Sequence, residues 1–130
     1  MKTLIVCLQL FAIDGDTVSC DGKHLRDMGS GVPFVSGFDA PEIFHPKCSY
    51  EHELGLRAKA RYSWMLAQPG TYIMGTGVTD DPVGFLHKRV NPRQLVNVYM
   101  ASGVALGDVL ISEGLAHKWE PYYKANWCSK

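Results

Sequence analysis

Two acidic motifs constrain what this chain can fold into more than any other feature of its sequence. The first is Asp14-Gly15-Asp16-Thr17 and the second is Asp39-Ala40-Pro41-Glu42. Carboxylates repel one another, so a fold that gathers Asp16, Asp39 and Glu42 requires a cation or a reaction to offset the repulsion. Hard divalent cations prefer oxygen ligands, and a further carboxylate beside the ion can act as a general base on water. The motifs therefore predict metal-assisted hydrolysis.

The composition is that of an ordinary globular chain. Of the 130 residues, 46% are hydrophobic and 20% are charged, which excludes a disordered chain and predicts one domain over residues 1–130. The net charge is zero. Because phosphate neutralisation supplies most of the affinity of nonspecific nucleic-acid binders, this neutrality counts against tight nonspecific binding. The best candidate for a local basic patch is His87-Lys88-Arg89 with Arg93.

The first third of the chain is predicted to form strands. Residues 3–12 are rich in β-forming side chains and lead directly into the first motif, which favours a first strand over an export signal. Asp21-Gly22 is typical of a hairpin turn between two further strands, 17–20 and one that begins at His24. Two glycines and a proline predict a loop over residues 27–33, and residues 34–36 are expected to be extended.

Helical periodicity appears after the second motif. A helix is predicted from Ser49 to Gln68, because four apolar side chains recur on one face: Leu54, Ala58, Tyr62 and Met65. Strands are predicted over 71–78 and 95–100, and a second helix is predicted between Ser102-Gly103 and Glu113-Gly114. Strands with a few helices, in this order, predict an α+β domain built on a small barrel. No apolar stretch is long enough to span a membrane.

The acidic motifs, in this order and at this separation, resemble those of the thermonuclease (staphylococcal nuclease-like) family. The resemblance runs from about Leu4 to Trp119. Asn91-Pro92-Arg93 and Ile111-Ser112-Glu113-Gly114-Leu115-Ala116 support it. It implies an OB-fold, here a five-stranded β-barrel capped by about three helices.

In that family, the second aspartate of the first motif and the aspartate of the second motif bind Ca²⁺. The resemblance therefore implies Asp16 and Asp39 as metal ligands, with the backbone carbonyl of Ala40 as a third. Family members often carry Thr at the position of Ala40, a difference that a backbone ligand tolerates. Asp14 and Thr17 would support the ligands. The alternative is a simple turn capped by its own aspartates.

The resemblance also implies catalytic residues. Glu42 matches the glutamate that orients or deprotonates the attacking water. The family uses two arginines, whose forked guanidinium suits a charged phosphate in the transition state. Arg93 matches the second of them, and Arg89 is its competitor.

The first arginine is the main departure from the family pattern. Family members usually place it five residues before the second motif's aspartate, where this chain has Phe34. Counted from the hairpin turn, the matching residue is Arg26, with eight residues inserted between it and Asp39. An inserted loop of this kind has a modest entropic cost. Arg26 is accordingly the predicted catalytic arginine, with a solvated strand arginine as the alternative.

The function that the resemblance implies is a Ca²⁺-dependent nuclease. It would hydrolyse phosphodiester bonds of DNA, with RNA as a further substrate, and prefer single strands. We expect a monomer whose partner is nucleic acid. The alternative, from another class, is a catalytically weak OB-fold module that binds nucleic acid or protein. Phe34, the inserted loop and the neutral charge favour the module, whereas the intact Asp16, Asp39 and Glu42 favour the enzyme.

The cysteines, at positions 7, 20, 48 and 128, fit neither a CxxC pair nor a zinc-ribbon spacing. If the protein is exported, we expect Cys48 to pair with Cys128 and tie the C-terminal segment to the first helix region. The alternative is four free thiols in a reducing compartment. We favour an extracellular or periplasmic location.

Two weaker patterns complete the sequence. The spacing His45-x-x-Cys48-x-x-x-His52 is compatible with a transition-metal site, but a fourth ligand is not evident, so loop and helix-surface residues are the preferred interpretation. Aromatic side chains near the end of the chain either stack on bases or pack at the barrel's edge, and packing is preferred. They are Tyr99, Trp119, Tyr122, Tyr123 and Trp127.

Overall fold

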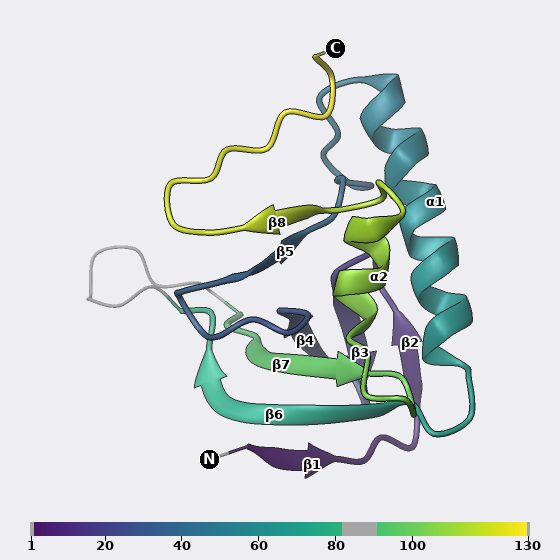
Figure 1. Cartoon of the computed structure of the whole chain (residues 1–130), viewed down its shortest axis with the longest axis vertical. Helices are drawn as coiled ribbons and strands as arrows, with labels where there is room; N and C mark the ends of the chain where they lie inside the picture. The colour runs from purple at the N-terminus through teal and green to yellow at the C-terminus, as the bar shows by residue number, and fades with distance from the viewer. Residues whose placement is uncertain (1, 82–90, 130) are drawn as a thin grey trace.

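The computed structural model describes residues 2–81 and 91–129, which form an α+β fold, as predicted (Figure 1). Six strands make one curled sheet in the order β1-β6-β7-β4-β3-β2. Their bounds are Thr3–Ile5 (β1), Leu10–Ala12 (β2), Thr17–Cys20 (β3), Lys23–Asp27 (β4), Tyr72–Thr79 (β6) and Gln94–Tyr99 (β7). β4 and β7 run parallel, and the other neighbouring strands run antiparallel. The two predicted strands after the helix are confirmed with small shifts at their ends.

The connection between β1 and β2 requires the sheet to curl. These strands lie at opposite ends of the sheet order, yet only residues 6–9 separate them in the chain. Five inter-strand spacings of a flat sheet would place the two edges about 24 Å apart. Five residue steps reach at most about 18 Å. The edges must therefore approach each other, and the sheet forms the wall of a half-barrel.

The prediction of one continuous strand over residues 3–12 is wrong. Residues 6–9 leave the hydrogen-bonded ladder, and the backbone N–H groups of Leu8 and Gln9 donate to Oδ1 of Asp21 instead. The break arises because β1 pairs with β6, whereas β2 pairs with β3. The chain thus crosses between sheet edges in the middle of an apolar run, and a local pattern contains no signal for that crossing.

The predicted hairpin at Asp21-Gly22 is confirmed. Both residues have positive φ, 52° for Asp21 and 84° for Gly22. Positive φ at both central residues is the geometry of the two-residue turn that matches the twist of antiparallel strands. The turn joins β3 to β4 and sets Thr17 opposite Arg26, which matters for the site.

The predicted helix is confirmed as α1 (Ser49–Leu66). The four apolar residues predicted to share a face are all buried against the sheet: Leu54, Ala58, Tyr62 and Met65. Cys48 is the N-cap, and its sulfur accepts a hydrogen bond from the backbone N–H of Glu51. The helix ends two residues before the predicted end, with Ala67 as its C-cap.

The inserted loop differs from the sequence prediction. Residues 34–36 are not extended. The backbone N–H groups of Val35 and Ser36 donate to the carbonyl of Val32, and Phe34 has a positive φ of 63°. The buried side chain of Asn97 fastens the loop by donating from Nδ2 to two of its carbonyls, those of Gly29 and Gly31.

The described residues hold two helices rather than about three. The second is α2 (Leu106–Ser112), the predicted helix near the end of the chain. Strand β8 (His117–Trp119) then pairs antiparallel with β5 (Gly37–Asp39) in a separate two-stranded sheet. From residue 120 to residue 129 the chain is irregular. This strand pairing replaces the further helix that the resemblance implies, and it places His117 opposite Asp39.

Two disulfides tie the chain together. Cys48 bonds to Cys128, the pairing expected for an exported chain, and Cys7 bonds to Cys20, a pairing that was not predicted. The first closes a loop with a sequence separation of 80 residues. Removing that much freedom from the unfolded chain stabilises the fold by about 4 kcal/mol in the chain-entropy account. Free thiols, the alternative reading, are absent from all four positions.

The buried carboxyl of Asp27, at the end of β4, makes the stability of the fold depend on pH. Asp27 is fully buried and accepts hydrogen bonds from the hydroxyl of Tyr62 (2.8 Å) and the N–H of Gly29 (2.7 Å). Burial raises the pKa of Asp27 from 3.8 to about 7. Between these values the folded state keeps a proton that the unfolded state has released, so stability falls as pH rises from about 4 to about 7.

Asp27→Asn is expected to reduce this pH dependence, because it removes the titrating group and keeps its shape. Denaturant unfolding of both proteins across that interval measures the slope. Some dependence of stability on pH should remain in the variant, since burial also raises the pKa of Asp14 to about 7 and that of Asp39 to about 6. If the stability of the variant fell with pH as steeply as that of the wild type, the pH dependence could not be assigned to Asp27.

Candidate functional site

Three segments bring the central residues of the site together. Asp16 precedes β3, Arg26 lies on β4 and Asp39 ends β5. Nη2 of Arg26 lies 3.2 Å from Oδ2 of Asp16 and 3.9 Å from Oδ1 of Asp39. The same nitrogen donates to the carbonyl of Phe38 at 2.8 Å. The guanidinium of Arg26 therefore lies between the two predicted metal ligands.

Small side chains let the two acidic motifs approach. Gly15 is buried, and a Cβ at this position would lie 2.7 Å from Cβ of Ala40 and 3.0 Å from Cβ of Ala58 on α1. Real Cβ atoms do not approach so closely, hence Gly15 is required by packing. Ala40 is likewise buried, and its N–H donates to Oδ2 of Asp16 at 2.9 Å. This hydrogen bond joins the two motifs directly.

Asp14 and Thr17 orient Asp16. Oδ1 of Asp14 accepts from the backbone N–H groups of Asp16 (3.0 Å) and Thr17 (2.9 Å), which fixes the turn. The hydroxyl of Thr17 donates to Oδ1 of Asp16 at 3.3 Å. Both residues thus contact Asp16, and their support of a metal ligand stays a prediction.

Arg93 reaches the site through Thr17. Its Nη1 donates to Oγ1 of Thr17 at 3.0 Å. Its Nε and its backbone N–H each donate to a carboxylate oxygen of Asp80, both at 2.7 Å. Asp80, which sequence reasoning missed, fixes the direction of Arg93. The competing Arg89 lies outside the described residues, as do His87 and Lys88 of the suggested basic patch.

The carboxylate of Asp39 contacts Tyr123, which in turn contacts His117. Oδ2 accepts a hydrogen bond from the hydroxyl of Tyr123 at 3.3 Å, and Nδ1 of His117 lies 3.1 Å from the same hydroxyl. Burial, and then the charge of Asp16, raises the pKa of Asp39 to about 6. Sequence reasoning assigned Tyr123 to packing and gave His117 no role. Their contacts depend on the β5–β8 pairing, which no local pattern indicated.

Glu42 follows Asp39 by three residues and has an exposed side chain. In the described parts of the chain, no side chain donates a hydrogen bond to its carboxylate. Partial burial, followed by the charges of Asp16 and Glu51, raises the pKa of Glu42 above its ordinary value. A carboxylate that is near the acidic cluster, unpaired and more basic than usual is suited to accept a proton from water.

Glu51 holds the loop that carries Glu42. It is buried, and its two carboxylate oxygens accept from the backbone N–H groups of Glu42 (3.1 Å) and Lys47 (2.9 Å). Sequence reasoning treated Glu51 as an ordinary residue of the helix start. The spacing Cys48-x-x-Glu51 resembles a capping box, and this signal was available in the sequence.

The charges of the cluster favour a cation. Arg26 forms ion pairs with Asp16 and Asp39 and interacts electrostatically with Asp14 and Glu42, whereas the charge of Arg93 is shared with Asp80. Burial raises the pKa of Asp14 to about 7, with the Asp16 charge adding to the shift. Burial acts on Asp16 as well, yet Arg26 and the Ala40 N–H hold the pKa of Asp16 below its ordinary value. Asp16 therefore stays ionised.

The donor set fits a hard divalent cation in its chemistry. Asp16, Asp39 and the Ala40 carbonyl offer oxygen atoms only, which are the ligands that Ca²⁺ prefers. Within residues 2–81 and 91–129, no three His, Cys, Asp or Glu side chains form a metal-holding group by themselves. A cation here would need the backbone carbonyl and water in addition to the two aspartates, and it would share them with Arg26.

The transition-metal pattern and two of the aromatic candidates, Tyr99 and Tyr122, do not join the site. Cys48 is disulfide-bonded and Nδ1 of His52 contacts the carbonyl of Ile43, so the transition-metal interpretation is wrong. Tyr99 stacks on Tyr72, with ring centroids 5.3 Å apart, which agrees with a packing role. Tyr122 is fully exposed.

Comparison with models of protein families gives no match to this chain, and neither does comparison with curated proteins. The function is therefore inferred from the residues of the site itself. No helix in the described parts of the chain is both long and apolar enough to cross a membrane.

Proposed function

We propose that this protein is a Ca²⁺-dependent nuclease that hydrolyses phosphodiester bonds of DNA, and of RNA as well, with a preference for single strands. We further propose that its curled sheet is the OB-fold barrel of the thermonuclease family. The observation that carries the proposal is the convergence of Asp16, Arg26 and Asp39 from separate segments of the chain. Phosphoryl chemistry requires carboxylates and a guanidinium close together, and this site supplies a guanidinium and two carboxylates that are buried or half-buried.

Each residue has a role in this proposal. Asp16, Asp39 and the Ala40 carbonyl would hold Ca²⁺, which would offset the charge of the scissile phosphate. Glu42 takes a proton from the attacking water as the water oxygen bonds to phosphorus. The ester bond to the leaving oxygen then breaks, and that oxygen takes a proton from solvent. Arg26 and Arg93 stabilise the negative charge that develops on the phosphate oxygens.

The surroundings of Arg26 support an extended, unpaired substrate. A cavity of about 210 Å³ lies beside this arginine, and the aromatic side chains of Phe34 and Trp119 line it, with the buried Phe38 behind them. Unpaired bases stack on such side chains, whereas bases in a duplex are already stacked. The disulfides support a protein that works in an oxidising compartment, outside the cell or in a periplasm.

A second candidate, the catalytically weak binding or interaction module, is favoured by one observation. Arg26 lies between the two aspartates and forms an ion pair with Asp16. A stable structural ion pair of this kind requires no reaction. The neutral net charge of the chain points the same way.

Degradation of labelled single-stranded DNA separates the two candidates. We expect the wild type to degrade single-stranded DNA in Ca²⁺ and to act more slowly on duplex DNA. The Asp39→Asn variant, which lacks one anionic ligand, should degrade single-stranded DNA about 100-fold more slowly or worse. An asparagine at this position can still accept a hydrogen bond from Tyr123, so the fold should persist. Equal rates for the two proteins would contradict the metal site, and binding without degradation by either would favour the module.

A further inference from the structure

The C-terminal segment reaches one of the proposed metal ligands. The hydroxyl of Tyr123 donates to Oδ2 of Asp39, and Nδ1 of His117 lies within hydrogen-bonding distance of that hydroxyl. Because the hydroxyl gives its proton to Asp39, its oxygen is left to accept one from His117. This assigns the His117 tautomer that carries its proton on Nδ1. The result is a hydrogen-bonded chain from His117 through Tyr123 to Asp39.

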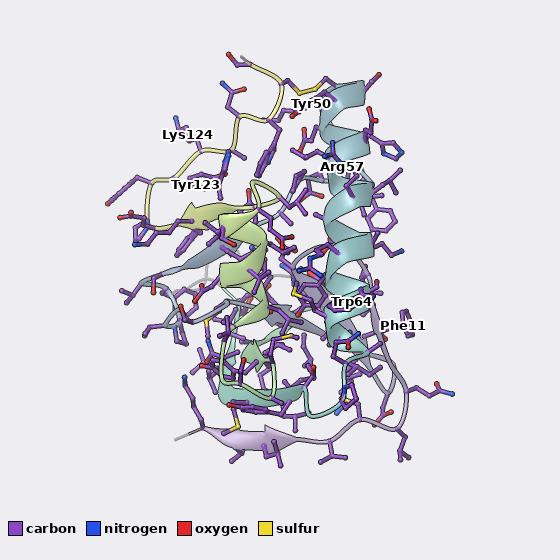
Figure 2. All side chains as sticks on the ribbon, turned by 45° about the vertical axis from the view of Figure 1, so that its right-hand side comes forward. Phe11, Tyr50, Arg57, Trp64, Tyr123 and Lys124 are labelled. Carbon is purple, nitrogen blue, oxygen red and sulfur yellow. A yellow bond between two sulfur atoms is a disulfide. The ribbon has the colours of Figure 1, made fainter. Side chains whose placement is uncertain are left out.

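Several contacts hold this segment in place. The rings of His117 and Trp127 stack, with centroids 3.8 Å apart and planes 17° apart, and Trp127 is buried. One residue further on, Cys128 is bonded to Cys48, the N-cap of α1. Figure 1 shows the segment leaving β8 and returning towards the start of α1, and Figure 2 shows Tyr123 on it and the disulfide at its end. These contacts fix the position of the segment that carries Tyr123.

The geometry at Asp39 gives the two carboxylate oxygens different neighbours. Oδ1 faces the guanidinium of Arg26 at 3.9 Å, whereas Oδ2 faces Tyr123. A phenol fixes the orientation of a carboxylate without adding a positive charge, so it does not repel a cation bound nearby. Hydrogen bonds from such neighbours to metal ligands are commonly needed for full metal affinity.

We propose that Tyr123 is a positioning residue of the candidate site, which holds the Asp39 carboxylate in the orientation that binds a divalent cation. The stacking of His117 on Trp127 and the Cys48–Cys128 bond keep Tyr123 in place. This inference rests on the proposed metal site and deepens it, because it makes the C-terminal segment part of that site. Tyr123 acts through Asp39 and does not touch the substrate.

The test is calorimetric titration of Ca²⁺ into the wild type, Tyr123→Phe and Tyr122→Phe. Tyr123→Phe keeps the ring and removes only the hydroxyl. Tyr122 is the adjacent tyrosine and is fully exposed, so it is the matched control. We expect roughly tenfold weaker Ca²⁺ binding for Tyr123→Phe, the lower end of the usual effect of losing such a partner. The control should bind as the wild type does.

Two further readouts separate positioning from general damage. DNA cleavage by Tyr123→Phe should recover to nearly the wild-type rate when Ca²⁺ is raised to saturation, since only metal affinity is impaired. A double variant, Cys48→Ser with Cys128→Ser, releases the segment and should also weaken Ca²⁺ binding. Wild-type Ca²⁺ affinity in both variants would overturn the positioning role and leave the proposed function standing. No Ca²⁺ binding by the wild type would overturn both.

Discussion

Glu42→Gln is expected to lower the rate of single-stranded DNA cleavage about 100-fold or more, because the amide cannot accept the proton of the attacking water. The effect should fall on the rate at saturating DNA, since Glu42 is not expected to bind the substrate. Its side chain is exposed, and the backbone N–H of Glu42, which Glu51 binds, is unchanged by the substitution. The variant should therefore unfold at the wild-type temperature.

The matched control for Glu42→Gln is Glu53→Gln on α1. Glu53 is an exposed glutamate without a place in the site, and its replacement removes the same charge from the molecule. We expect that variant to cleave as the wild type does. If Glu42→Gln kept the wild-type rate, water activation would have to be assigned to another group. If both variants slowed equally, the effect would come from net charge and not from a general base.

Arg26→Ala is expected to have two separable effects. Without Ca²⁺ it leaves Asp16 buried and unpaired, which should destabilise the fold by about 3–5 kcal/mol. With Ca²⁺ part of that loss should be recovered, because the cation takes over the neutralisation of Asp16. Cleavage should still fall by about 100-fold or more, since the group that stabilises the transition-state charge is gone. Thermal unfolding with and without Ca²⁺, beside cleavage rates, measures both effects.

Arg26→Lys is the control that separates charge from shape. Lysine supplies a positive charge near Asp16, but its single ammonium nitrogen lacks the further N–H groups with which a guanidinium can bind phosphate oxygens while Nη2 contacts Asp16 and the Phe38 carbonyl. We expect this variant to keep most of the stability and to lose most of the activity. Wild-type activity in either variant would make Arg26 a structural residue only. Wild-type stability of Arg26→Ala without Ca²⁺ would contradict the importance of its ion pair with Asp16.

The parts of the site that depend on local sequence were predictable. Asp14, Asp16 and Thr17 lie in one turn, so their mutual hydrogen bonds follow from adjacent residues. Arg26 was found by counting from the hairpin turn, because the turn fixes the β3–β4 register. The helix α1 was also predictable from local sequence, because its apolar residues recur at each helical turn.

The parts that depend on distant contacts were not predictable. Tyr123 reaches Asp39 across 84 positions of the chain, and only after β8 has paired with β5. Asp80 fixes Arg93 across 13 positions of the chain. The broken first strand and the Cys7–Cys20 bond both follow from the closure of the sheet. In each case the contact that determines the structure joins two segments, and the sequence of neither segment indicates the other as its partner.

The most direct test of the central claim is the rate of single-stranded DNA cleavage by the wild type as Ca²⁺ is removed by a chelator and then added back. The proposed site predicts that cleavage stops on chelation and returns on re-addition, while circular dichroism shows a folded protein throughout. Cleavage that continues in chelator would contradict the Ca²⁺ dependence. No cleavage by folded protein at any Ca²⁺ concentration would contradict the nuclease itself and leave the binding module as the account of this fold.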